Sequence, residues 1–357
     1  MPGVFVVKKS QSDITPDAPY LVPSELIHAL ERLRTPIVMS HVVPDADALG
    51  SMAALARAWK SDRCRPKVAL PEGSVSPRLA FLPEWGSVSV ASETDFGRAD
   101  GFIVVDTAKK DRCNVGPNLK ETDWSAGKPV FCIDHHESNT RFGDINWVVD
   151  RAGSSAELVY HLLVGAGKPI DRPTASLLYA GIMSDTLGFS LPTTNASALR
   201  AAADLVTRGA DVGDLGERLF RSHRQSEFDL LRIIYSHTRV EARGAIAYSY
   251  ASFDDIHGTG CTATDIDDQI TVPRSLDGVR LAMLFTEGKK GRTRINFRSS
   301  GSVTVSDLAA EFDGGGHAQA AGAILDCGLK KAIERVVPVA VAYLEKFSSD
   351  SRGKGKA

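Results

Sequence analysis

Four short clusters of histidine and aspartate residues in this chain could bind metal ions and support hydrolysis. The first is HVVPDAD, in which His41, Asp45 and Asp47 occur within seven residues. Carboxylate oxygens mixed with imidazole nitrogens suit a divalent cation such as Mn²⁺. Proline and aspartate are also common in surface turns, so this cluster alone does not separate a metal site from a turn.

Two further clusters follow apolar runs. Asp106 ends the run FIVVD, where a buried carboxylate needs a cation or a hydrogen-bond donor, although a helix N-cap or a turn explains a single aspartate better. Asp134, His135 and His136 follow the run VFCI. Adjacent histidines on an extended chain point in different directions, so one can bind metal while the other reaches a substrate. A polar loop is the alternative for this tripeptide.

The remaining candidates lie later in the chain. Asp185 ends the segment AGIMSD, whose apolar side chains cannot offset a buried charge. A helix exit would also explain it, but one shared cation accounts for four clusters better than four coincidences do. Gly314, Gly315 and Gly316 precede His317 and offer backbone N–H groups that a phosphate or nucleotide can approach. A flexible turn is the alternative, and the helix-like alanine run that follows argues against it.

The elements around these clusters must bring them together. From residue 35 onward the short apolar runs PIVMS, KVAL, FIVVD and VFCID alternate with longer amphipathic stretches. This pattern is typical of a parallel sheet with helices on both faces. Three of the runs lead directly into the clusters, and the carboxyl ends of parallel strands meet at one edge of a sheet. We therefore predict an α/β domain with one site at that edge.

The second half of the chain has a different pattern. Helical periodicity dominates from residue 153 to about residue 230, with Asn195 at an N-cap position and Gly209 at a helix stop. Strand-like runs return at 245–251, 279–287 and 293–300, with Gly288 and Gly291 between the last two. We predict a catalytic metal-binding domain at 20–192, a helical linker at 193–238, a smaller α+β substrate-binding domain at 239–346 and a disordered tail at 347–357.

Composition excludes several classes of protein. The 357 residues include 42 Lys and Arg against 44 Asp and Glu, so the chain lacks the positive charge of a duplex-DNA binder. No run approaches the roughly 20 apolar residues of a membrane span, and the start of the chain does not have the pattern of a signal peptide. Five scattered cysteines without a C-x-x-C pair indicate a reducing compartment. We expect a cytoplasmic protein.

Five segments in this order, HVVPDADALGS, VVDTA, IDHHESN, MSDT and GGGHAQAAG, resemble the DHH phosphoesterase superfamily with its C-terminal DHH-associated domain. The resemblance runs from about Leu26 to Lys346. The segments NTRFGDINWVVD, GSSAELVY, DTLGF and INFRSS are most similar to the nano-RNase/pAp phosphatase branch. Ala46 departs from the pattern, because the family usually has glycine there, and a positive φ at this turn would strain alanine.

The resemblance implies a set of metal ligands and catalytic residues. One Mn²⁺ would be bound by His41, Asp45 and Asp106, and a second by Asp47, Asp106, His135 and Asp185. Asp106 would therefore bridge the two ions, with Mg²⁺ or Co²⁺ as substitutes. The implied catalytic residues are Asp106, Asp134 and His136. His136 would contact the scissile phosphate, and Asp134 would orient a ligating histidine.

A separate group would bind the nucleotide or its non-scissile phosphate: Arg298, Gly314, Gly315, Gly316 and His317. Taken alone, Arg298 would be an exposed strand residue in a salt bridge. The implied activity is a manganese-dependent phosphoesterase acting on RNAs from dinucleotides to pentanucleotides and on 3′-phosphoadenosine 5′-phosphate. A homodimer is compatible with the family.

Other activities stay open at this point. A linear or cyclic dinucleotide phosphodiesterase would use the same metal site. A RecJ-type single-strand exonuclease usually has extra nucleic-acid-binding domains, for which 357 residues leave little room. A manganese pyrophosphatase shares the first segments but lacks GGGH. The alternative of another class is a non-catalytic nucleotide-sensing module, and the complete set of six ligands argues against it.

Overall fold

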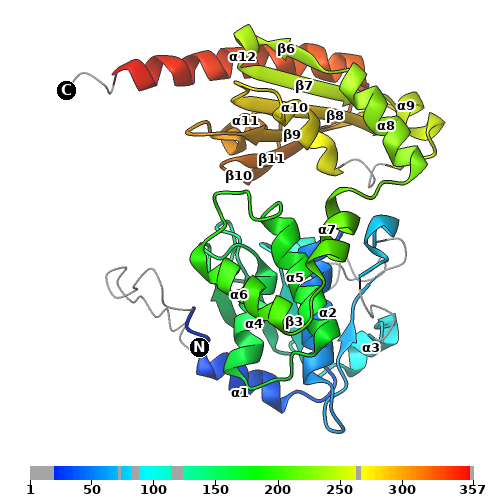
Figure 1. The fold of residues 1–357 in the computed structure, drawn as a ribbon, viewed down its shortest axis with the longest axis vertical. Helices are drawn as coiled ribbons and strands as arrows, with labels where there is room; N and C mark the ends of the chain where they lie inside the picture. Colours follow the sequence, from blue (N-terminus) through cyan, green and yellow to red (C-terminus); the bar gives the residue numbers. More distant parts are fainter. Residues whose placement is uncertain (1–19, 71–73, 83–87, 114–123, 263–266, 354–357) are drawn as a thin grey trace. The chain divides into compact units, whose positions relative to one another are not determined.

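The computed structural model describes residues 20–70, 74–82, 88–113, 124–262 and 267–353. The chain forms two compact units, residues 1–222 and 223–357 (Figure 1). The boundary between them falls inside the segment expected to be a helical linker. None of the described helices is long and apolar enough to cross a membrane.

The first unit contains a five-stranded parallel sheet. Its strands are β1 (Ile37–Met39), β2 (Lys67–Val68), β3 (Phe102–Val105), β4 (Val130–Asp134) and β5 (Ile145–Val148). Their order is β2-β1-β3-β4-β5, and every pair is parallel. The chain passes from β1 outward to β2 and then returns to the other side of β1 as β3. Such a switch point leaves a crevice outside the carboxyl ends of β1 and β3.

Helices cover both faces of this sheet, as the sequence predicted. They are α1 (Ser24–Arg32), α2 (Ala46–Trp59), α3 (Glu93–Arg98), α4 (Ser155–Gly165), α5 (Arg172–Asp185), α6 (Ala196–Thr207) and α7 (Val212–Phe220). On β3, Ile103 and Val105 face the core formed with α2, α4 and α5, whereas Phe102 and Val104 face Phe96 of α3. The alternation explains why the strands are apolar at nearly every position.

Local signals identified the two ends of α6. Asn195 caps α6, because its side chain accepts hydrogen bonds from the N–H groups of Ser197 and Ala198. Gly209 follows the helix with a φ of 104°. Ala46 is the first residue of α2 and does not have a positive φ. The alanine at this position therefore brings no backbone strain.

Close contact between α2 and α5 depends on two glycines. A Cβ on Gly50 would overlap the carbonyl oxygen of Leu177 in α5. A Cβ on Gly181 would lie 2.6 Å from the Cβ of Ala156 and 2.9 Å from a carboxylate oxygen of Asp47. Because neither glycine carries a side chain, α2, α4 and α5 pack closely just behind the carboxyl ends of the strands.

The second unit contains a mixed six-stranded sheet. Its strands are β6 (Arg239–Glu241), β7 (Ile246–Ala251), β8 (Leu281–Lys289), β9 (Arg292–Ser299), β10 (Gly315–His317) and β11 (Ala320–Leu325), in the order β10-β11-β9-β8-β7-β6. Only the pair β7 and β8 is parallel. The sheet forms an α+β unit with two helical layers.

The two helical layers pack on opposite faces of this sheet. One layer is α8 (Gln225–Ser236), α9 (Phe253–Gly258) and α10 (Thr271–Arg274), and the other is α11 (Val305–Ala310) and α12 (Leu329–Gly353). Ala282 and Leu284 of β8 pack with the first layer, whereas Met283 and Phe285 pack with the second. The predicted domain end at residue 346 falls inside α12.

The prediction of a helix-like run after His317 is wrong. The run forms β11, which pairs with β9 and β10. Gly316 has a φ of 146°, and a Cβ on it would lie 2.6 Å from the Cα of Ala321. The small residues therefore allow strands to approach closely, and sheet pairing overrides the helix propensity of alanine.

The glycine packing generates a stability prediction. We expect Gly50→Ala to lower the free energy of unfolding by about 1–3 kcal/mol, because the new methyl group overlaps backbone atoms. The matched control is Gly97→Ala in α3, where a Cβ meets no atom within 4 Å. The control should be neutral or stabilising by up to about 1 kcal/mol. Urea unfolding of both variants measures the difference, and equal stability would contradict the packing argument.

Candidate active site

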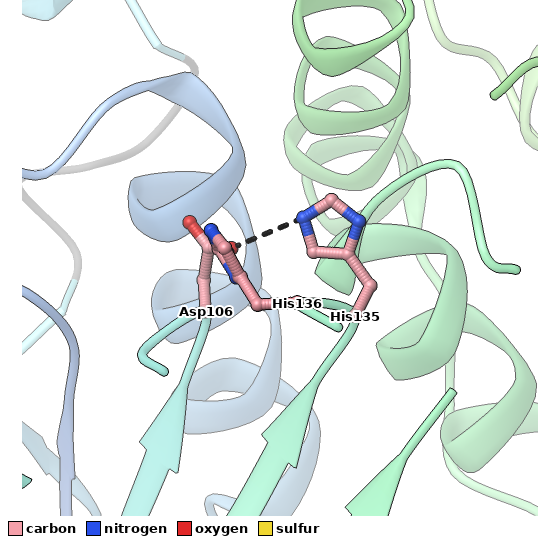
Figure 2. Close-up of side chains that lie close together, drawn as sticks. All are labelled: Asp106, His135 and His136. Carbon is pink, nitrogen blue, oxygen red and sulfur yellow. Dashed lines mark ion pairs between the residues drawn. The ribbon is translucent and has the colours of Figure 1, made fainter. Parts of the chain in front are cut away.

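The predicted site residues of the first unit meet at the carboxyl ends of β1, β3 and β4. Asp106 follows β3, and His135 and His136 follow β4, so these side chains lie next to one another at adjacent strand ends (Figure 2). Asp106 has a φ of 51°, a left-handed conformation that aspartate tolerates better than most residues. His41 follows β1, and its backbone pairs with that of Cys113.

Asp106 lies at the centre of the site. Its side chain is buried, and its two oxygens face different histidines. Oδ2 lies 3.4 Å from Nε2 of His41. Oδ1 lies 3.5 Å from Nε2 of His135 and 3.7 Å from Nδ1 of His136. This carboxylate therefore connects the residues that follow three strands.

Two more carboxylates come from helices. Asp47, in the first turn of α2, is fully buried and accepts hydrogen bonds of 2.7 Å from the backbone N–H groups of both Ser155 and Ala156. Asp185, the last residue of α5, has its Oδ2 atom 3.2 Å from Nε2 of His135. Asp45 caps α2 by accepting a bond from the N–H of Ala48.

Among the described residues, three groups of side chains could each hold a metal ion. Within each group the ligand atoms lie within 4.8 Å of one another. The groups are His41, Asp45 and Asp106; Asp47, His135 and Asp185; and Asp106, His135 and His136. The structure thus brings together all six residues expected to bind metal. Their mixture of carboxylate oxygens and imidazole nitrogens fits divalent cations.

The predicted nucleotide-binding residues belong to the second unit. Arg298 of β9 pairs with Ala320 of β11, which in turn pairs with His317 of β10. Arg298 is half-buried, and its Nη1 donates to the carbonyl of Phe297. Gly314 donates its N–H to the carbonyl of Ala309. Arg298 and His317 therefore occupy one register row of the sheet, two strands apart.

Hydrogen bonds orient the two adjacent histidines differently. The Nδ1 atom of His135 lies 3.3 Å from the carbonyl oxygen of Ala152, to which it donates, so that Nε2 faces the carboxylates. Asp134 was expected to orient a ligating histidine. Its Oδ1 atom accepts a 2.7 Å bond from Nδ1 of His136 and a 2.9 Å bond from the backbone N–H of His135, and Asn139 donates to its Oδ2 atom at 2.6 Å. Asp134 therefore holds the histidine that was expected to contact the substrate.

Three groups that form hydrogen bonds with the site residues had no predicted role. They are the carbonyl of Ala152, the hydroxyl of Ser155 and the side-chain amide of Asn139. Ser155 donates to Asp106 at 3.2 Å, although 49 positions separate the two residues. Ser155 and Asn139 lie within the segments GSSAELVY and IDHHESN, which carried the resemblance. The segments were therefore a signal, but their local pattern does not indicate which side chains reach another element.

Burial and mutual repulsion shift the pKa values of these groups. Burial opposes ionisation of Asp106, but hydrogen bonds from His135 and His41 outweigh it and hold its pKa well below the usual range. Burial and the charges of Asp106 and Asp185 raise the pKa of Asp47 well above the usual range. Desolvation raises the pKa of Asp185 to about 7 despite the nearby His135. The pKa of His135 is also raised, because the carboxylates outweigh the effect of burial.

Comparisons with known proteins agree with this geometry. Residues 36–182 match the DHH family, N-terminal domain, and residues 244–346 match the DHHA1 domain. Over 303 residues the chain is 29% identical to the bifunctional oligoribonuclease and PAP phosphatase NrnA of Bacillus subtilis (strain 168), covering 84% of this chain and 92% of that protein. The NrnA protein of Thermus thermophilus is also 29% identical, over 86% of this chain and 90% of its own length.

A solved structure shares the fold. The exopolyphosphatase-related protein from Bacteroides fragilis matches with a TM-score of 0.81 and 23% sequence identity. The match covers 91% of this chain and 98% of that chain. At this level of identity the likeness concerns the fold alone.

The pKa shifts predict that cation binding releases protons. Asp47 and Asp185 must be ionised and His135 neutral to act as ligands, whereas their raised pKa values favour protonation in the metal-free protein. We therefore expect the affinity for Mn²⁺ to rise as the pH increases from about 6 to about 8. Calorimetric titration in buffers of different ionisation enthalpy measures the number of protons released. A pH-independent affinity would contradict the assignment of these ligands.

Proposed function

This chain belongs to the DHH family of phosphoesterases, and from that membership we propose a hydrolase that uses two Mn²⁺ ions to degrade short oligoribonucleotides and to dephosphorylate 3′-phosphoadenosine 5′-phosphate. The hydrolase class follows from the family. The substrates, the manganese and the number of ions are the proposal. We also propose a cytoplasmic location and the domain limits 20–192 and 239–346.

The observation that carries this proposal is the clustering of three carboxylates and three histidines around Asp106. His41, Asp45 and Asp106 would hold one ion, and Asp47, His135 and Asp185 would hold the other, with Asp106 shared. A pair of divalent cations in such a site supplies Lewis-acid stabilisation of phosphoryl oxygens and makes water a stronger nucleophile at neutral pH. The names of the NrnA relatives support short RNA and PAP as substrates.

His136, held by Asp134, would stabilise charge or transfer a proton next to the metal ligands. His136 is the most exposed of the three histidines, with 26% of its side chain accessible. Burial disfavours its charged form, but the hydrogen bond that its Nδ1 donates to Asp134 and the charge of Asp106 outweigh this and raise its pKa. Because Nδ1 donates to Asp134, the protonated ring would present its Nε2–H to the substrate. His136 would stabilise a phosphoryl oxygen or protonate the leaving oxygen.

Recognition of the substrate is assigned to the second unit in this proposal. The guanidinium of Arg298 can form a forked pair with a phosphate, which lysine cannot reproduce. The nucleotide would be contacted by Gly314, which precedes β10, and by Gly315, Gly316 and His317 of β10. A near-neutral chain, with a net charge of -2, lacks the extended basic track that long single strands need.

A panel of substrates tests this function. With Mn²⁺, we expect kcat/KM to be high for dinucleotides, pentanucleotides and 3′-phosphoadenosine 5′-phosphate and to fall steeply for a long RNA. The panel includes a cyclic dinucleotide, a short DNA and pyrophosphate, and it is repeated with Mg²⁺. A cyclic dinucleotide as the best substrate would favour the dinucleotide phosphodiesterase, and equal activity on long RNA would favour the exonuclease. No hydrolysis with either ion would favour a nucleotide-sensing module.

The shared ligand generates a second prediction. Asp106→Ala should lose more activity and more bound metal than Asp45→Ala, because Asp106 belongs to the group with His41 and Asp45 and to the group with His135 and His136, whereas Asp45 belongs to one group only. Metal content per chain and turnover are measured on the same preparations. Near-normal turnover of Asp106→Ala would contradict a two-ion site.

The two adjacent histidines should separate chemistry from metal binding. His136→Ala should keep most of its bound Mn²⁺ while kcat falls by roughly 10², the effect of losing one charge-stabilising group. His135→Ala should lose metal, because its Nε2 atom faces both Asp106 and Asp185. The reverse pattern would show that the two roles are exchanged.

A further inference from the structure

The side chain of Ser155 joins the metal ligands to the start of α4. Its hydroxyl donates to Oδ1 of Asp106 at 3.2 Å, and the residue is completely buried. The backbone N–H groups of Ser155 and Ala156 hold the two oxygens of Asp47 at 2.7 Å each. The first turn of α4 therefore contacts two carboxylates, Asp47 through its backbone and Asp106 through a side chain.

Other hydrogen bonds fix this turn of α4. The hydroxyl of Ser154 caps the helix by accepting a 3.0 Å bond from the N–H of Glu157. The carboxylate of Glu157 accepts a 2.8 Å bond from the N–H of Gly153. Both side chains are completely buried. The position of Ser155 is thus set by bonds that do not involve its own hydroxyl.

The hydroxyl of Ser155 distinguishes the two oxygens of Asp106. Oδ2 faces His41, at 3.4 Å from its Nε2 atom. Oδ1 faces His135, at 3.5 Å, and is the oxygen to which Ser155 donates. Of the two oxygens of Asp106, the Ser155 hydroxyl therefore contacts the one that faces His135 and its group with Asp47 and Asp185.

We propose that Ser155 is a positioning residue that orients Oδ1 of Asp106 and thereby strengthens binding of the ion held with Asp47, His135 and Asp185, but not of the ion held with His41 and Asp45. This inference rests on the proposed two-ion function. Hydrogen bonds to ligating carboxylates fix their orientation, and losing one typically weakens metal binding about 10- to 100-fold. Ser155→Ala leaves both backbone bonds to Asp47 in place.

The test compares Ser155→Ala with Ser154→Ala, which removes the same atom from an equally buried neighbour. Metal-free proteins are titrated with Mn²⁺ by calorimetry. We expect two binding events in the wild type, with one weakened about 10- to 100-fold in Ser155→Ala and the other unchanged. Ser154→Ala should lower the unfolding midpoint by loss of the helix cap and should weaken metal binding far less than Ser155→Ala does, because the bond from Gly153 to Glu157 still holds the turn.

Two further backgrounds assign the weakened event. His41→Ala should bind only the ion held with Asp47, His135 and Asp185, and adding Ser155→Ala should weaken that binding. His135→Ala should bind only the ion held with His41 and Asp45, and adding Ser155→Ala should leave that binding unchanged. Equal weakening of both events, or an equal effect of Ser154→Ala, would overturn the inference and show a structural role only. Fewer than two ions per wild-type chain would instead overturn the two-ion proposal on which the inference rests.

Discussion

Crowding of negative charge around the buried carboxylate of Asp106 is the constraint on which the site depends. Burial and the charge of Asp106 raise the pKa values of Asp47 and Asp185, whereas hydrogen bonds from His135 and His41 hold the pKa of Asp106 low. Histidines from two strand ends offset part of this charge. The negative charge that the histidines do not offset explains why these ligand residues fit divalent cations, which would balance several carboxylates at once.

The first unit meets this constraint through its topology and its helix packing. The switch point beside β1 brings the ends of β1 and β3 together, so His41 and Asp106 meet without any long loop. Asp47 needs donors at the same depth, and the start of α4 supplies two backbone N–H groups. The absence of a side chain at Gly181 lets the helices approach closely enough for these bonds to form.

The two histidines of the DHH segment show how neighbours in sequence acquire different environments. His135 donates to the carbonyl of Ala152 and directs Nε2 at the carboxylates. His136 is held by Asp134 and stays more exposed. The different orientations of the two rings thus depend on two hydrogen bonds, one to the carbonyl of Ala152 and one to the carboxylate of Asp134. Asn139 supports this arrangement by anchoring the second oxygen of Asp134.

The amino-acid sequence by itself determined the parallel-sheet class and the α+β character of the second unit, because apolar periodicity is a local property. It also contained the histidine and aspartate clusters from which the family resemblance implied six candidate ligands. Only the tertiary structure decided that Asp134 bonds to His136, that Ser155 reaches Asp106, and that the alanine run after His317 is a strand. The contact of Ser155 with Asp47 joins residues 108 positions apart. Such contacts, like the pairing of β11, depend on which elements pack together, and no local pattern contains that information.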